Sequence, residues 1–267
     1  MSNSASKKLV NPFTRPDHVV DLFIDCEFVD QGVKGTALIS FGAMVCGSKS
    51  VKSFYGIDTA FFRTPVFMDH MRGDDEQSKW MRDHVYVHIR GTAVSGAEHK
   101  RGRITELLDI LKQDNATFTV DFDQTYPALV KDWTPDNSDE NDPDVLVVGA
   151  QAKIAAALEE TIKDVRTVDI DKDNIVRTWG YYSSNDFVLL QNLHGGMLSM
   201  PEHYYYFNYD LRALGDVFGY SHDDLNCDGP HHALSDALEQ YQMTQKLRGM
   251  IAKDFGTRFI PNIKSFW

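Results

Sequence analysis

The hydrophobic pattern near the N-terminus predicts three strands in quick succession. Residues 19–28, 36–46 and 51–57 are rich in β-branched and apolar side chains, with glycine and polar residues between the stretches. Strands joined by connections this short pair with their neighbours in the chain and run in opposite directions. We therefore expect an antiparallel meander of three strands.

The remainder of the chain predicts helices that alternate with single strands. In chain order, the predicted elements are helix 75–84, helix 103–113, helix 151–164, strand 174–180, helix 185–194, strand 203–209, helix 210–218 and helix 232–252. Strands first, and then helices interleaved with strands, are typical of an α/β fold in which helices flank a mixed sheet of about five strands.

The expected domain organisation is one globular domain over residues 19–255. Residues 1–18 are polar and predict a flexible N-terminal arm, and residues 256–267 are expected to form a C-terminal tail. Residues 115–150 contain little regular pattern, which indicates an insertion or a long loop within the domain.

Composition narrows the class of protein. Apolar residues make up 42% of the 267 residues, enough to form a sizeable core. The longest apolar runs are strand-sized, well below the roughly 20 residues that a membrane-spanning helix needs, so we expect no membrane segment. Three cysteines in no paired spacing argue against a disulfide framework or a zinc site, and favour a reducing, cytoplasmic location.

The net charge of −12 at first argues against a nucleic-acid partner, because such proteins usually carry a basic surface. Part of the acidic excess lies in segment 136–144, whose polarity is typical of an exposed loop. Other acids would be neutralised if they hold divalent cations. The charge therefore weakens a nucleic-acid function without excluding it.

The first candidate site lies in the most apolar strand, where Asp25 and Glu27 flank Cys26. Because side chains alternate along a strand, the two carboxylates point to the same face. Carboxylate oxygens are hard ligands that suit Mg²⁺ or Mn²⁺, so a metal site accounts for two acids in such a strand. Salt bridges to Lys or Arg at an exposed strand end are the alternative.

The second candidate site opens the long C-terminal helix, where Pro230 is followed by His231, His232 and, in the second turn, Asp236. Histidine titrates near neutral pH and can take a proton from water, while an aspartate can complete a metal shell. The alternative is an ordinary helix start, with an acid favoured by the helix dipole and histidines on the surface. Periodicity does not decide between the two histidines.

The third candidate is Asp186, which follows Ser183, Ser184 and Asn185 at the start of a predicted helix. The functional interpretation places a metal-binding carboxylate there. An equally good local interpretation is a capped helix N-terminus, since serine and asparagine are favoured N-cap residues. Only the combination of the three candidates favours a shared site.

The three motifs, in this order along the chain, resemble the DEDDh group of 3′–5′ exonucleases of the ribonuclease H-like superfamily. The surrounding residues are similar to the branch that contains ribonuclease AS-type exoribonucleases and phage exonuclease A. The resemblance covers about residues 20–57 and 175–247, and it is carried by FIDCEFVDQ, LISFGAMV, WGYYSSNDFVLLQNLHGGM, DLRAL and HHALSDALEQ.

The resemblance implies a ribonuclease H-like fold and a set of catalytic residues. Four acids would bind the metal ions, and His231, five residues before the last of them, would be the general base; the acids are Asp25, Glu27, Asp186 and Asp236. His232 stands where relatives often have an aspartate, and the spacing between the first and second motifs is longer than in the group.

The implied activity is hydrolysis of single-stranded nucleic acid from its 3′ end to nucleoside 5′-monophosphates by a mechanism with two Mg²⁺ or Mn²⁺ ions. RNA is favoured as the substrate, because the second motif resembles the exoribonuclease members slightly more closely. Single-stranded DNA is the close alternative, because discrimination rests on contacts to the 2′-hydroxyl that a sequence does not reveal. Two other functions remain to be distinguished from an exonuclease: a non-catalytic nucleic-acid-binding module and a hydrolase of small phosphoesters. The sequence leaves the assembly open, with a homodimer as one option.

Overall fold

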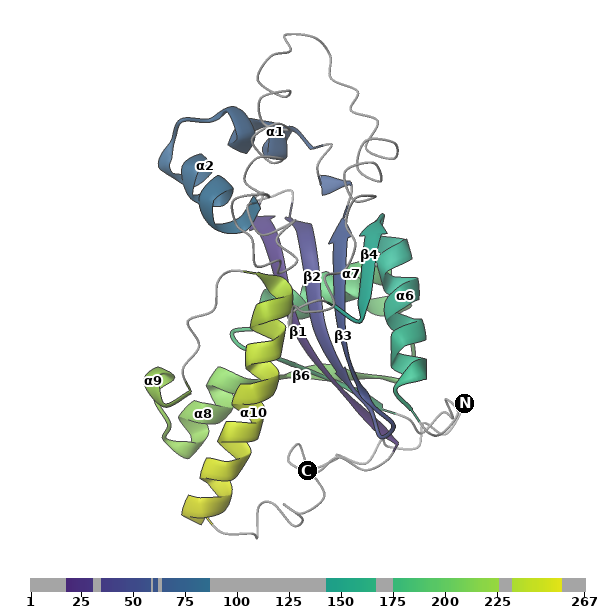
Figure 1. The fold of residues 1–267 in the computed structure, drawn as a ribbon, viewed down its shortest axis with the longest axis vertical. Coiled ribbons are helices and arrows are strands. Elements are labelled where there is room, and N and C mark those ends of the chain that lie inside the picture. Colours follow the sequence, from purple (N-terminus) through teal and green to yellow (C-terminus); the bar gives the residue numbers. More distant parts are fainter. Residues whose placement is uncertain are drawn as a thin grey trace.

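The computed structural model describes residues 18–30, 35–58, 60–61, 64–86, 143–166, 175–225 and 232–255. A six-stranded sheet with the strand order β4-β3-β2-β1-β5-β6 forms its centre. The strands are β1 (Val19–Asp30), β2 (Thr36–Cys46), β3 (Val51–Asp58), β4 (Val145–Gly149), β5 (Ile175–Gly180) and β6 (Tyr204–Asp210). Helices flank the sheet on both sides, as Figure 1 shows.

The sheet is mixed. β1, β2 and β3 form the expected antiparallel meander. β4 is parallel to β3, β5 is parallel to β1, and β6 is parallel to β5. The parallel pairs are connected through helices, as parallel strands require long crossover connections.

The helices are α1 (Pro65–Arg72), α2 (Glu76–Met81), α6 (Gln151–Asp164), α7 (Ser184–Leu193), α8 (Leu211–Phe218), α9 (His222–Leu225) and α10 (Ala233–Phe255). A π-helix (Arg82–Tyr86) continues α2, and a 3₁₀ helix (Met197–Ser199) follows α7. α6 and α7 lie on one side of the sheet, and α8 and α10 lie on the other (Figure 1). The molecule therefore has three layers, with the sheet in the middle.

Strand alternation divides the core into two clusters. Leu22 and Ile24 of β1 pack in the cluster that includes α6 and α7. Phe23 packs in the other cluster, with apolar residues of α10 such as Ala237 and Leu247. Side chains at odd-numbered positions of β1 thus face α10, which is the face that Asp25 and Glu27 share.

A buried ion cluster joins α10 to the sheet. Asp21 accepts hydrogen bonds from Nε and Nη2 of Arg177 at 2.7 and 2.9 Å, and from Nε1 of Trp179 at 2.8 Å. Nη2 of Arg248, from α10, lies 3.8 Å from Asp21 Oδ2, and its guanidinium lies over the Trp179 ring. A buried carboxylate with this many partners holds α10 against β1 and β5.

The α/β class, the mixed sheet and its antiparallel first three strands are confirmed. The predicted helix over 151–164 coincides with α6, and the predicted strands and helices after it are found within a few residues of their expected bounds. The predicted helix 103–113, the N-terminal arm and the C-terminal tail lie outside the described residues, except that His18 is described as a turn.

The structure contains two elements in the first 150 residues that the sequence pattern does not predict. The sheet has six strands where about five are expected, because β4 lies inside the segment 115–150 that predicts only an insertion or a long loop. Five residues at the sheet edge are too few for periodicity to distinguish a strand from an apolar stretch of loop. The pattern also misses α1, an eight-residue helix that begins at Pro65 with Thr64 as its N-cap.

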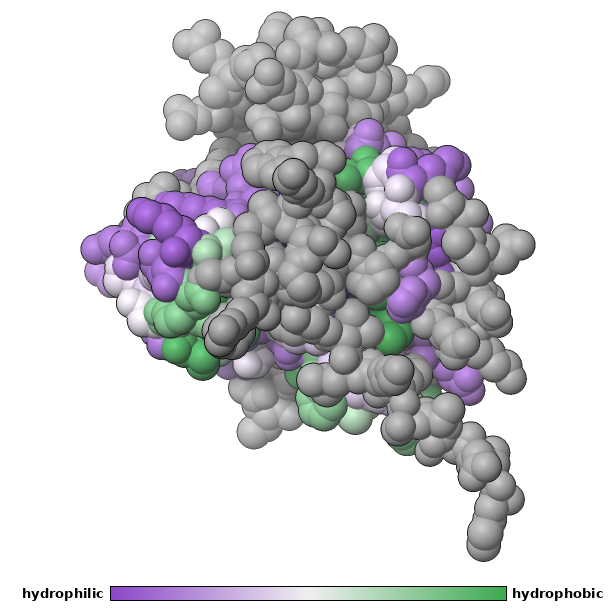
Figure 2. Space-filling model, turned by 90° about the horizontal axis from the view of Figure 1, so that it is seen from below, coloured by the Kyte–Doolittle hydropathy of each residue, from purple (hydrophilic) through white to green (hydrophobic). Residues whose placement is uncertain are grey.

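The described surface is mostly hydrophilic on the face seen from below, with smaller hydrophobic areas between (Figure 2). The most exposed large apolar side chains include Leu198, Val217, Phe207 and Tyr182. No helix in the described part of the chain combines the length and the apolar character that crossing a membrane requires.

Candidate metal centre

Asp25 and Glu27 lie side by side on the α10 face of β1. Cys26 between them is buried in the opposite cluster, with α6 and α7, as strand alternation requires. β1 extends beyond its pairing with β5, which ends at Phe23, so this stretch is hydrogen-bonded as a strand to β2 alone. The two carboxylates therefore lie on a strand that is paired on one side only, at the open end of the β1–β5 pair.

Close packing of α10 on β2 brings a third carboxylate to the same place. Gly42 pairs with Asp25 across the β1–β2 ladder. A Cβ atom at Gly42 would lie 2.1 Å from the carbonyl carbon of Ala233 and 2.3 Å from the backbone nitrogen of Leu234. Only glycine allows the start of α10 to approach the sheet this closely. Asp236, in the first turn of α10, thereby reaches the carboxylates of β1.

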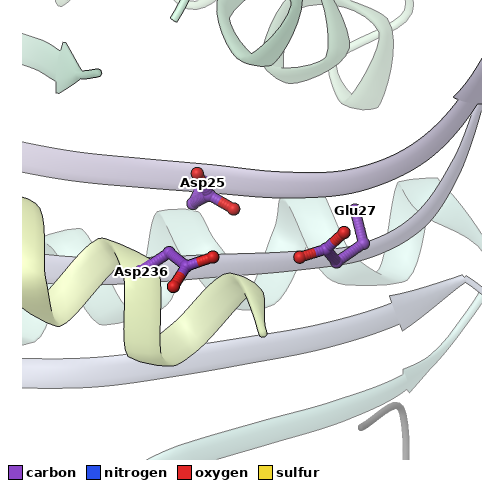
Figure 3. Close-up of side chains that lie close together, drawn as sticks. All are labelled: Asp25, Glu27 and Asp236. Atoms are coloured by element: carbon purple, nitrogen blue, oxygen red, sulfur yellow. The ribbon is translucent and has the colours of Figure 1, made fainter. Parts of the chain in front are cut away.

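Three of the predicted acids converge. Asp25, Glu27 and Asp236 each offer a carboxylate oxygen, and these oxygens all lie within 4.8 Å of one another. Figure 3 shows the three side chains pointing toward a common space between β1 and the start of α10. Oxygen atoms in such a cluster can coordinate one hard divalent cation.

The fourth predicted acid, Asp186, joins the cluster from the other side of β1. It is buried in the first turn of α7, and its Oδ1 accepts a hydrogen bond from the backbone N–H of Cys26 at 3.0 Å. Its negative charge raises the pKa of both Asp25 and Glu27, so it lies within electrostatic reach of them. The structure therefore brings all four predicted acids together, with Asp186 outside the closest three.

Burial raises the pKa of every acid in the cluster, and for Asp25, Glu27 and Asp236 the charges of other cluster acids raise it further. Burial, and then the charges of Asp236 and Asp186, raise the pKa of Glu27 to about 8. Burial also raises the pKa of Asp186 and that of Asp236 to about 7. For Asp25, burial and the charge of Asp186 hold the pKa well above its ordinary range. At neutral pH the metal-free cluster therefore retains protons that a cation would displace.

The cluster fits a divalent cation better than a salt-bridge network. None of the four acids forms an ion pair with a Lys, Arg or His in the described part of the chain. Oδ1 of Asp236 is buried, and no described residue supplies it with a hydrogen bond. Buried carboxylates are normally paired or coordinated to metal, so the acids match the hard oxygen ligands that Mg²⁺ and Mn²⁺ prefer.

Only one of the two histidines before α10 falls among the described residues. His231, the predicted general base, lies outside the described residues. His232 is only 3% exposed, and its ring stacks on Tyr55 at 4.8 Å. Its Nδ1 accepts a hydrogen bond from the backbone N–H of Ser235 at 3.3 Å, the bond that an N-cap residue makes to the third helical residue. His232 therefore starts α10, and this structural role explains a polar residue at that position.

Sequence reasoning misses one polar residue that contacts the cluster. Gln240 of α10 is buried, and its Nε2 donates a hydrogen bond to Oδ1 of Asp25 at 3.1 Å. Its position one helical turn after Asp236 is the available signal, because residues four apart lie on the same helix face. A glutamine at that spacing is not distinctive enough to predict the contact.

The arrangement can bind a hard cation beside the open end of β1. Without a cation, its acids exchange protons with the solvent near neutral pH. Such a centre can activate water or stabilise charge that develops on a phosphoryl oxygen. No protein-family model matches the sequence, and no curated protein is significantly similar to it.

Proposed function

We propose that the protein is a metal-dependent 3′–5′ exonuclease that hydrolyses single-stranded nucleic acid, with RNA as the favoured substrate. The observation that carries this proposal is the convergence of carboxylate oxygens of Asp25, Glu27 and Asp236 within 4.8 Å. Asp186 lies beside them and accepts a hydrogen bond from the backbone N–H of Cys26, the residue between Asp25 and Glu27. These are the four acids, in the chain order, that the resemblance to DEDDh exonucleases assigns to metal binding.

The fold is consistent with the proposal. The strand order β3-β2-β1-β5-β6, antiparallel over the first three and parallel over the rest, is compatible with a ribonuclease H-like sheet to which β4 is added at the edge. The acids lie on the central strand β1 and on two helices that pack on opposite faces beside it. Metal-dependent phosphodiester chemistry requires such carboxylates from several rigid elements.

Each residue has a defined task in the proposed reaction. Asp25, Glu27 and Asp236 would hold the cations, and Asp186, which accepts the N–H of Cys26, would complete the set. A bound pair of Mg²⁺ or Mn²⁺ ions would supply water activation and stabilise charge on the departing 3′ oxygen. His231 would act as the general base that takes a proton from the attacking water. The product is a nucleoside 5′-monophosphate, released one unit at a time.

A ladder assay tests the proposal. Matched 5′-labelled RNA and DNA oligonucleotides are incubated with the protein in Mg²⁺, in Mn²⁺ and in EDTA, beside an Asp186→Asn control. A ladder shortened from the 3′ end, stronger on RNA, absent in EDTA and absent in the control is the expected result. Cleavage that survives EDTA or the substitution contradicts the proposed chemistry.

The same assay separates the other classes of function. A stronger ladder on DNA identifies an exodeoxyribonuclease, because the two substrates differ mainly in the 2′-hydroxyl. A hydrolase of small phosphoesters cleaves a free nucleotide and leaves the oligonucleotides intact. A binding module retards the oligonucleotides in a gel and produces no ladder.

A further inference from the structure

Gln240 links the two elements that carry the three closest acids. It lies one turn after Asp236 on α10 and is only 3% exposed. Its Nε2 donates to Oδ1 of Asp25 at 3.1 Å, across 215 residues of sequence. This hydrogen bond, which has one buried partner, restricts rotation of the Asp25 carboxylate and leaves the second carboxylate oxygen available to a cation.

The other end of the same amide has no partner among the described residues. Oε1 of Gln240 is buried without a hydrogen bond, and so is Oδ1 of Asp236 one turn earlier. Burying an unsatisfied amide oxygen is unfavourable, so this glutamine is not explained by the stability of the helix alone. Its contact with Asp25 accounts for keeping an amide at this position.

The chemistry of an amide suits a residue that supports a cation site. A Lys or Arg in place of Gln240 would also hold Asp25, but its positive charge would compete with the cation for the acids. A glutamine donates a hydrogen bond and adds no charge. It therefore fixes the carboxylate and leaves the full negative charge of the cluster for the metal.

We infer that Gln240 is a positioning residue of the metal centre, which orients Asp25 for coordination and couples α10 to β1 at the site. The inference rests on the metal site of the proposed function. Residues that orient metal ligands in this way typically alter metal affinity by about 10–100-fold when they are replaced.

Manganese binding to the full chain, followed by electron paramagnetic resonance of free Mn²⁺, tests the role without relying on turnover. Gln240→Met keeps a similar length and volume but cannot donate, and we expect the Mn²⁺ dissociation constant to rise at least about tenfold. Thr244→Val is the matched control, because Thr244 is buried one turn further along the same helix and, among the described residues, donates to the backbone oxygen of Gln240 alone. It should bind Mn²⁺ within about twofold of the wild type.

The melting temperature of the metal-free protein separates positioning from a purely structural role. Gln240→Met removes a buried unsatisfied oxygen but also the hydrogen bond to Asp25, so the two effects oppose each other and the metal-free variant should melt close to the wild type. At saturating Mn²⁺ the KM for the oligonucleotide should be unchanged, while the Mn²⁺ concentration for half-maximal cleavage rises. A lower melting temperature with unchanged Mn²⁺ affinity would overturn the inference.

A second variant keeps the test decisive if Gln240→Met does not fold. Gln240→Asn retains an amide that is one methylene shorter and cannot hold the same contact, so it should weaken Mn²⁺ binding in the same direction. Wild-type affinity in this variant refutes the positioning role and leaves the proposed function intact. Failure of the wild-type protein itself to bind Mn²⁺ refutes the proposed function instead.

Discussion

The backbone N–H of Cys26 donates a hydrogen bond to Oδ1 of Asp186 at 3.0 Å. This contact ties the first turn of α7 to the point on β1 that lies between Asp25 and Glu27. β5 pairs with β1 only as far as Phe23, so the carboxylate supplies an acceptor where the next strand does not. The side chain of Asp186 thus has two tasks: it accepts a hydrogen bond from a backbone N–H of β1, and it adds negative charge to the cluster.

Replacing Asp186 by asparagine or alanine should separate these two tasks. Asp186→Asn keeps an oxygen that can accept the Cys26 N–H but loses the charge, so cleavage should fall by more than the roughly 10–100-fold typical of a supporting residue. Asp186→Ala also leaves the N–H without its acceptor, which should cost a further 1–3 kcal/mol or so in the free energy of unfolding. Urea unfolding and the ladder assay measure the two effects, and equal stability of the variants would contradict the second task.

The raised pKa values predict how stability of the metal-free protein varies with pH. Glu27, with a folded-state pKa of about 8, and Asp186 and Asp236, at about 7, hold protons that the unfolded chain has released above about pH 4. Their contribution to stability is therefore complete below about pH 4 and is lost as pH rises toward 8. Burial lowers the pKa of His70 and of His194, and these groups act in the opposite direction.

The contribution of Glu27 is isolated by comparing the melting temperatures of the wild type and the Glu27→Gln variant at each pH. In EDTA, the wild type should lose stability relative to the variant between pH 5 and pH 8, as melting temperatures will show. With saturating Mn²⁺ the wild type should instead gain stability relative to the variant as pH rises, since cation binding requires the deprotonated acids. A pH-independent difference between the two proteins in EDTA is the outcome that contradicts the raised pKa values.

Glu27→Gln should also have opposite effects on the metal-free and metal-loaded protein at a single pH. At pH 8 it removes a repelled, buried carboxylate, so the metal-free melting temperature should rise by about 2–6 °C. It also removes a ligand, so Mn²⁺ should stabilise the variant far less than the wild type. Glu160→Gln on α6 is the control, because Glu160 is exposed and pairs only with Lys163 in the described structure.

The parts of the fold and site that local pattern determines were predictable. Alternation along an apolar strand placed Asp25 and Glu27 on one face, and the structure confirms this. Helical periodicity located α6 and the long helix that carries Asp236 within a few residues. These features depend on interactions between residues close in sequence, which a single chain displays directly.

The features that the sequence did not reveal depend on contacts across the fold. The hydrogen bond from Gln240 to Asp25 spans 215 residues, and the bond from Cys26 to Asp186 spans 160. Neither partner is unusual in its own segment, so each contact appears only when strands and helices are packed. The edge strand β4 is short, and its pairing with β3 supplies the stabilisation that local pattern lacks.

The adjacent histidines predict a contrast between function and stability. His231→Ala should lower cleavage by about 10²–10⁴-fold if that residue is the general base. His232→Ala removes the N-cap of α10, which should lower the free energy of unfolding by about 1 kcal/mol, while His232→Asn restores a capping side chain. Cleavage assays and urea unfolding of the three variants check the contrast. Full activity of His231→Ala together with loss of activity in His232→Asn would show that His232, and not His231, is the general base.

Gly42 should be indispensable to the metal centre although it has no side chain. In Gly42→Ala the new Cβ would meet the backbone of Ala233 at 2.1 Å, so the start of α10 must move away from β2. Overpacking of this kind typically costs about 1–3 kcal/mol of stability. The same movement withdraws Asp236 from Asp25 and Glu27, so Mn²⁺ affinity should fall as well.

Gly249→Ala is the matched control for this substitution, because a Cβ there meets nothing within 4 Å and the residue lies inside α10. Alanine in a helix interior should stabilise the protein by about 0.5–1 kcal/mol and leave Mn²⁺ binding unchanged. Urea unfolding and Mn²⁺ titration of both variants give the comparison. If Gly42→Ala binds Mn²⁺ as the wild type does, the close approach of α10 to β2 does not determine the position of Asp236, and the geometry of the centre must be set elsewhere.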